Sequence, residues 1–262
     1  MKLIRNLPNI LTLFNLFLGC MAIVYIFQDH MIVIDQKKNM FIDLGKINLA
    51  CYCVFLAAFI DFFDGFIARL LKAQSKLGEQ LDSLADMVTF GLVPGVILFE
   101  LLARSYYASV EAFDYPILYY SIGFAVTLFA ALRLAKFNID ERQVTEFRGL
   151  PTPSMALIVC SLPLIILKDE LGLAALLTNK WFLLVLIILL CYLMVSDLRL
   201  LSLKMKNFRF AENNWQYMIL LLATAVLLWG LFIAQILFVL IPLVIMIYII
   251  LSIAKNIKEH GI

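Results

Sequence analysis

Long apolar runs separated by short polar segments dominate the hydrophobicity pattern of this chain. A membrane-spanning helix needs about 20 apolar residues, and runs of about that length recur along the sequence. They predict eight helices, over residues 8–27, 47–68, 84–103, 116–137, 150–167, 181–196, 214–231 and 233–253. The last two share one tract, so a tight turn near Gly230 is expected to divide it. A count of six is the alternative if the region 150–196 packs differently.

The amino-acid composition, taken with this pattern, indicates the fold class. Of 262 residues, 64% are hydrophobic and 15% are charged, whereas an average soluble domain is about 45–50% apolar and about 25% charged. The apolar excess must face lipid, which predicts an all-α polytopic membrane bundle forming a single domain over residues 1–262. The first span is expected to be retained, because no small-residue cleavage pattern follows it.

Several other classes of protein are excluded by the same counts. The net charge is only +2 and the basic residues form no dense run, so a nucleic-acid-binding protein is not indicated. The five cysteines lie in apolar stretches without a C-x-x-C pair, so they are interpreted as reduced small hydrophobic residues. With two histidines in the chain, at positions 30 and 260, a histidine-based active site is not expected.

The basic residues predict how the chain is oriented. Across the eight expected spans, the 21 Lys and Arg residues divide 15 to 6 between the two sides of the membrane. The richer side is assigned to the cytoplasm, together with both termini and the loops 69–81, 138–149 and 197–213. We therefore expect a multi-pass protein of the cell membrane.

Four aspartates lie in or next to the predicted spans. Inserting a charged residue at the centre of a membrane helix costs about 2.5–3.5 kcal/mol of free energy on insertion scales. Asp61 and Asp64 are three residues apart near the end of the second span, and Asp82 and Asp86 are four apart at the start of the third. Each spacing puts its pair on one helix face. A lone Asp there would simply cap a helix or reach the interface. Because a short loop makes the two spans antiparallel neighbours, the four carboxylates are expected to converge.

The expected cluster favours metal-assisted chemistry. Converging carboxylates repel one another unless hard divalent cations with oxygen ligands neutralise them, at one or two metal positions. Gly65 and Ala68 leave the acidic face with little bulk, although small residues also permit close helix packing. Arg69 on the adjoining face suits phosphate oxygens. These parts are typical of phosphoryl-type displacement, in which positioning and charge neutralisation dominate.

These residues resemble a known family signature. The run Asp61-x2-Asp64-Gly65-x2-Ala68-Arg69-x8-Gly78-x3-Asp82-x3-Asp86 matches the motif of the CDP-alcohol phosphatidyltransferases without a departure. Further matches are similar to the bacterial and archaeal phosphatidylserine synthase branch. They are Pro8-Asn9 with Thr12 and Asn15, the run 82–91 with Pro94, the runs 131–138 and 149–153, and Ser196 with Arg199.

The resemblance implies a role for each matching residue. Asp61, Asp64 and Asp82 would hold Mg²⁺ or Mn²⁺, with Asp86 completing a second metal position and acting as the general base. The implied substrate-binding residues are Asn9, Thr12, Gly65, Ala68, Arg69, Ser75 and Gly78, with cytidine lying against Gly65 and Ala68 and the diphosphate held by Arg69 and Ser75. Relatives are homodimers, so a homodimer is expected.

The acceptor alcohol is the open part of this interpretation. The resemblance implies transfer of a phosphatidyl group from CDP-diacylglycerol to serine. The serine carboxylate needs a cation, and Arg133, near the cytoplasmic end of the fourth predicted span, is the candidate for binding it. Other residues expected to close the cleft are Lys136, Asn138, Arg148, Thr152, Ser154 and Ser196. Glycerol 3-phosphate, inositol, inositol phosphate or choline are alternative acceptors. A cation transporter that uses the Asp cluster is a more distant alternative, although no internal repeat or interrupted helix supports it.

Overall fold

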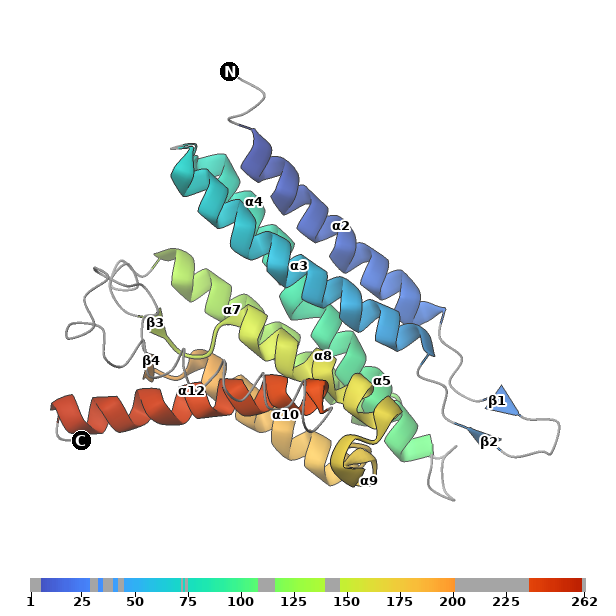
Figure 1. The fold of residues 1–262 in the computed structure, drawn as a ribbon. Helices are drawn as coiled ribbons and strands as arrows, with labels where there is room; N and C mark the ends of the chain where they lie inside the picture. Colours follow the sequence, from blue (N-terminus) through green and yellow to red (C-terminus); the bar gives the residue numbers. More distant parts are fainter. Residues whose placement is uncertain are drawn as a thin grey trace.

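The chain folds as an all-α membrane bundle, shown as a ribbon in Figure 1. The computed structural model describes residues 6–28, 33–34, 40–41, 45–71, 73, 75–107, 116–139, 147–200 and 236–260. Five of the described helices are long and apolar enough to cross a membrane. They are Leu7–Phe27, Gly45–Leu70, Lys76–Tyr106, Leu118–Ile139 and Leu237–Ala254.

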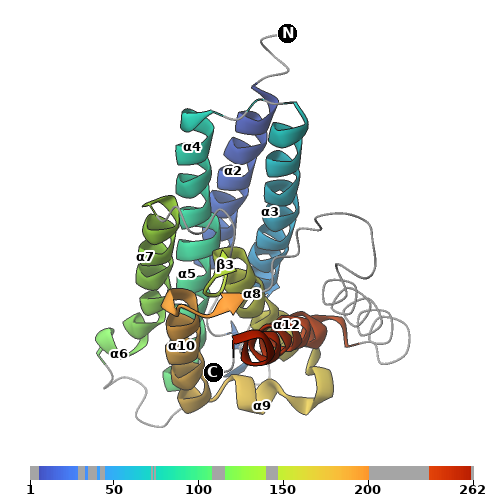
Figure 2. The same ribbon diagram turned by 90° about the vertical axis from the view of Figure 1, so that its left-hand side faces the viewer.

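Three helices run side by side and form one end of the bundle (Figures 1 and 2). They are α2 (Leu7–Phe27), α3 (Gly45–Leu70) and α4 (Lys76–Asp86). Pro8 lies in the first turn of α2, where its missing N–H costs nothing. Ser75 caps α4, because its hydroxyl accepts the Gly78 N–H at 3.0 Å. This cap begins a new helix shortly after α3 ends, which makes α3 and α4 antiparallel.

A π-helical segment, η1 (Met87–Leu92), joins α4 to α5 (Val93–Tyr107), so that one continuous helix crosses the bundle. A π segment leaves some backbone carbonyls without their usual partner. Thr127 donates its hydroxyl to the Gly91 carbonyl at 3.0 Å, and Thr89 donates to the Asn15 carbonyl at 3.2 Å. Both threonines therefore tie the segment to neighbouring helices.

The fourth span combines α6 (Leu118–Ser121), the 3₁₀ turn η3 (Ile122–Phe124) and α7 (Ala125–Ile139). Gly123 packs directly on the backbone of α5, where an added Cβ would lie 2.5 Å from the Phe99 nitrogen. Only glycine allows this approach, which brings α7 alongside η1.

The second half of the chain begins with α8 (Thr152–Lys168), followed by the 3₁₀ turn η5 (Glu170–Gly172), α9 (Ala174–Leu177) and α10 (Lys180–Val195). Strand β3 (Phe147–Arg148) pairs antiparallel with β4 (Arg199–Leu200) beside this group, and β1 (Val33–Ile34) pairs with β2 (Met40–Phe41). Gly149 has a φ of +69°, and an added Cβ would lie 2.6 Å from the Met194 carbonyl oxygen. The entry into α8 therefore requires glycine.

The last helix, α12 (Leu237–His260), lies inclined to α2 and α3 (Figure 1) and packs against α8. Glu170, only 5% exposed, fixes its start. Its carboxylate accepts the N–H groups of Phe238 at 3.0 Å and Val239 at 2.9 Å. Lys168 lies over the Phe238 ring at 4.7 Å. The first turn of α12, whose amides have no partner within the helix, is thus held by the α8–α9 corner.

The expected spans can be compared with the described helices. Seven of the eight predicted runs coincide with described helices, whereas 214–231 and the turn near Gly230 lie outside the described residues. The count of eight stays a prediction. The third span starts at residue 76 rather than 84, because the polar residues 76–83 extend the helix beyond its apolar run. The apolar helices α8 and α10, of 17 and 16 residues, are shorter than a full span.

Candidate active site

Three carboxylates meet between α3 and α4. One oxygen from each of Asp61, Asp64 and Asp82 lies within 4.8 Å of the other two. Helical spacing on α3 and the antiparallel arrangement of α4 produce this convergence. Oxygen ligands at this separation suit a hard divalent cation.

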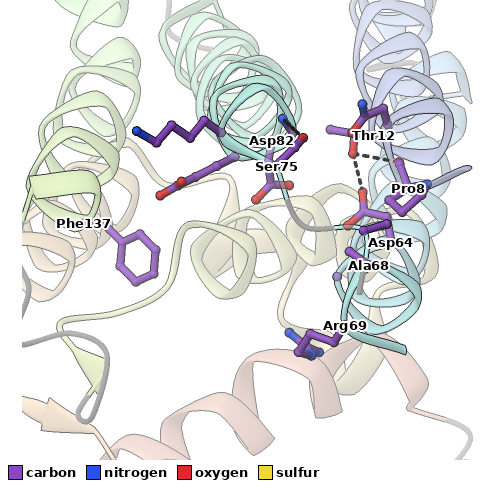
Figure 3. Close-up of a pocket in the computed structure, with 14 residues that line it drawn as sticks. Pro8, Thr12, Asp64, Ala68, Arg69, Ser75, Asp82 and Phe137 are labelled. Atoms are coloured by element: carbon purple, nitrogen blue, oxygen red, sulfur yellow. Dashed lines mark hydrogen bonds between the residues drawn. The ribbon is translucent and has the colours of Figure 1, made fainter. Parts of the chain in front are cut away.

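Thr12 on α2 holds one member of this group in place. Its hydroxyl donates to Asp64 Oδ2 at 2.9 Å, and it also lies 3.1 Å from the Pro8 carbonyl oxygen (Figure 3). Both Thr12 and Asp64 are buried, at 4% and 5% exposure. Thr12 was expected to line the cleft, and the structure shows that it also orients a carboxylate.

Asp86 is the last residue of α4, one turn deeper than Asp82. It lies beside the group of three rather than within it. Its Oδ1 atom is buried and accepts no hydrogen bond from the described part of the chain. The Arg133 guanidinium is close enough to interact with it electrostatically. A buried carboxylate can accept a proton from a hydroxyl group bound beside it.

A cavity of about 620 Å³ is lined in part by the carboxylates of Asp64 and Asp82. Figure 3 shows Asp82 facing it from α4, Asp64 from α3, and the Phe137 ring from α7 on the opposite side. Its lining residues are Pro8, Asn9, Thr12, Asp64, Gly65, Ala68, Arg69, Ala73, Ser75, Lys76, Gly78, Glu79, Asp82 and Phe137. Every residue that the sequence suggested for nucleotide binding is in this set, whereas Asp61, Asp86 and Arg133 are not.

Two glycines of the motif have different surroundings. At Gly65 an added Cβ would meet only Arg69 Nη1, at 3.7 Å, so this backbone faces open space in the cavity. At Gly78 it would lie 2.9 Å from Asn9 Oδ1 and 3.2 Å from Ser75 Oγ. Gly78 therefore gives room to the Asn9 side chain and to the cap of α4, in addition to lining the cavity.

A second polar group lies between α7, α8 and α4. Arg133, 7% exposed, donates from Nη1 to Thr152 Oγ1 at 3.3 Å and lies 5.8 Å from the centre of the Phe137 ring. Asn138 donates to Ser83 Oγ at 3.0 Å, which links α7 to the helix that carries Asp82. The structure thus places Arg133 beside Asp86 and next to the lining of the cavity.

Four residues that line the cavity were not suggested by the sequence, namely Ala73, Lys76, Glu79 and Phe137. Glu79 lies three residues before Asp82, on the same helix face. Phe137 lies four residues after Arg133 on α7, so these two residues also share one helix face. Helical spacing from a residue already identified could therefore have found both, although an exposed Glu and an aromatic residue in a span are common without such a role.

Comparisons with known proteins bear on this site. The family model described as CDP-alcohol phosphatidyltransferase matches residues 5–191. The chain is 34% identical to CDP-diacylglycerol–serine O-phosphatidyltransferase of Bacillus subtilis over 140 residues, which are 52% of this chain and 74% of that protein. It is 31% identical to the Helicobacter pylori protein of the same name over 221 residues, or 82% and 78%. It is 30% identical to archaetidylserine synthase of Methanothermobacter thermautotrophicus over 132 residues, or 50% and 52%.

Proposed function

Because the chain belongs to the CDP-alcohol phosphatidyltransferase family, we propose that it transfers the phosphatidyl group of CDP-diacylglycerol to the hydroxyl of L-serine. The products are phosphatidylserine and CMP. The observation that carries the serine assignment is the similarity to proteins named for serine transfer, one of which matches 82% of this chain. The site is consistent with it, since three carboxylates and Arg69 border one cavity.

The residues at the site fit a divalent cation. Three carboxylates within 4.8 Å form an oxygen donor set, and a bare group of this charge inside a membrane would be costly. Asp61, Asp64 and Asp82 would hold Mg²⁺ or Mn²⁺, with Asp86 near enough for a second position. Such an ion supplies neutralisation of the diphosphate and of the CMP that leaves.

The nucleotide is proposed to occupy the cavity above the carboxylates. Gly65 and Ala68 leave a face of α3 where the flat cytosine ring can lie against the backbone. Arg69 and Ser75, at the two ends of the α3–α4 connection, bind the nucleotide and its diphosphate. Asn9 lines the same wall from α2.

A larger side chain at Gly65 tests this placement. Gly65→Leu should weaken CDP-diacylglycerol binding by roughly tenfold or more, because the side chain fills space that the ligand needs. Gly65→Ala is the matched control, since its Cβ makes only an ordinary contact with Arg69. The measurement is KM for CDP-diacylglycerol at saturating serine. Equal KM values for the two variants would move the nucleotide away from α3.

The chemical step needs a base and an oriented acceptor. The serine hydroxyl oxygen forms a bond to the phosphorus that carries diacylglycerol, and the bond from that phosphorus to the CMP oxygen breaks. The buried carboxylate of Asp86 takes the hydroxyl proton. Arg133, buried beside Asp86 and held by Thr152, binds the serine carboxylate.

The setting of the reaction is part of the proposal. The chain is a multi-pass membrane protein. We propose that it lies in the cell membrane with the site and both termini at the cytoplasmic face, which the excess of Lys and Arg on one side of the expected spans supports. We further propose one domain over residues 1–262, acting as a homodimer.

A panel of acceptors tests the function. Purified protein should release CMP only when CDP-diacylglycerol, Mg²⁺ or Mn²⁺, and serine are all present, because each supplies a separate part of the reaction. The parallel arms contain glycerol 3-phosphate, inositol, inositol phosphate or choline in place of serine, and EDTA in place of metal. Equal or faster release with another acceptor would refute the serine assignment, and no release with any acceptor would refute the enzyme function.

A further inference from the structure

Asn15 carries an amide that is unusual for the interior of a membrane helix. Its side chain is 0% exposed, and neither Oδ1 nor Nδ2 has a hydrogen-bond partner within the described residues. Leaving a buried polar group unpaired is unfavourable, and buried polar groups in proteins are generally paired with protein or with ordered water. Nothing in the described part of the bundle supplies the protein partner, so a small polar molecule is the expected one.

Two hydrogen bonds, one made by Thr12 and one by Thr89, fix the depth of Asn15. Thr12 meets Asp64, and α2 runs antiparallel to α3. Asn15, three residues deeper on α2, is therefore level with Asp61, three residues earlier on α3. Thr89, whose hydroxyl donates to the Asn15 carbonyl, is three residues past Asp86 on the third helix. The Asn15 amide thus lies at the floor of the acidic group, at the depth of Asp61 and Asp86.

Asp86 shows the complementary feature. Its Oδ1 atom is buried and unpaired within the same described region, although η1 and α4 pack against α2. An amide donor and a carboxylate acceptor, both unpaired, thus occupy one level of two neighbouring helices. A water molecule is able to bridge such a pair, since it accepts one hydrogen bond and donates another.

We propose that Asn15 is a positioning residue for Asp86, acting through an ordered water. The water accepts a hydrogen bond from Asn15 Nδ2 and donates one to Asp86 Oδ1. This contact fixes the rotation of the carboxylate, so that Oδ2 is turned toward the acceptor hydroxyl. The inference rests on the proposed function for the role of Asp86, whereas the water bridge itself depends only on the two unpaired groups.

The side chain of Asn15 can be altered without removing its other contact. Thr89 bonds to the Asn15 backbone carbonyl, which every substitution retains. Asn15→Leu has a similar size and no polar atoms, and should lower kcat roughly 10- to 100-fold while KM for both substrates changes less than about twofold. Asn15→Ser keeps a hydroxyl for the water and should stay within about threefold of the natural kcat.

Asn48 offers a matched control. It is a buried asparagine of the same bundle, on the first turn of α3 and far from the carboxylates, and its Oδ1 also has no partner within the described chain. Asn48→Leu should leave kcat unchanged. A natural kcat in Asn15→Leu, or equal losses in Asn15→Leu and Asn48→Leu, would overturn the positioning role.

A thermal cycle tests the bridge without relying on activity. Melting temperatures are measured for the natural protein, Asn15→Leu, Asp86→Leu and the double variant, because leucine at either position removes the hydrogen bond to the water. Coupled groups give shifts that do not add, so the double variant should melt above the temperature expected from the sum of the single shifts. Additive shifts would overturn the bridge. If CMP release is absent from the natural protein but the shifts are non-additive, the proposed function fails and the bridge stands.

Discussion

Asp86→Asn should lower the rate of CMP release by roughly 1,000-fold or more, because the amide cannot accept the proton of the acceptor hydroxyl. The substitution keeps the shape of the side chain at the end of α4, where Oδ1 is buried and unpaired within the described residues. Binding of CDP-diacylglycerol should persist, because Asp86 does not line the cavity assigned to the nucleotide. The rate is measured as CMP released per enzyme, and binding as ligand-induced thermal stabilisation.

The two readouts separate a base from a structural residue. A variant that loses turnover but is still stabilised thermally by CDP-diacylglycerol has lost the chemical step and kept substrate binding. Residual activity above about a tenth of the natural rate would remove Asp86 as the base. Loss of both readouts together would instead place Asp86 among the binding residues.

The second large effect is expected at Asp82. Asp82→Asn removes a negative charge from the group formed with Asp61 and Asp64. Mn²⁺ affinity should fall at least roughly 100-fold, since even an outer-shell partner of a metal site is worth 10- to 100-fold in affinity. CMP release should fall with it at any attainable metal concentration. Electron paramagnetic resonance of free Mn²⁺ during titration measures the affinity directly.

Asp169 supplies the matched control for this titration. It lies at the opposite end of the bundle, with a φ of 48° and with its Oδ1 accepting the Ala174 N–H at 3.0 Å. Asparagine tolerates that backbone conformation, and its amide oxygen can accept the same hydrogen bond. Asp169→Asn should therefore bind Mn²⁺ as the natural protein does. Undiminished Mn²⁺ binding by Asp82→Asn would exclude Asp82 as a ligand.

The helices were largely predictable because each is a long apolar run with polar ends. The expected runs 8–27 and 116–137 differ by only a few residues from Leu7–Phe27 and Leu118–Ile139. The π segment at Met87–Leu92 was not predictable, because tertiary contacts specify it. Its carbonyls depend on Thr127 from another helix and its position on Asn15 from a third, neither of which local periodicity reports.

In the candidate site, too, contacts set by spacing along one helix were predictable, whereas contacts between helices were not. Spacings of three and four residues predicted that the aspartates would converge, and Asp61, Asp64 and Asp82 do meet. Spacing along one helix could not show that Thr12 holds Asp64, or that Thr152 holds Arg133. Each of these contacts joins residues from different helices, and depends on how deep each helix sits relative to its neighbour.

The buried carboxylate of Glu170 also bears on the order in which the chain assembles. Its partners, the amides of Phe238 and Val239, are synthesised almost 70 residues later, beyond the region 5–191 shared with the family. Until those amides emerge, Glu170 lacks both of these hydrogen-bond donors. The α8–α9 corner is therefore complete only once α12 has docked, and a truncation before residue 238 would leave the buried carboxylate of Glu170 without either amide.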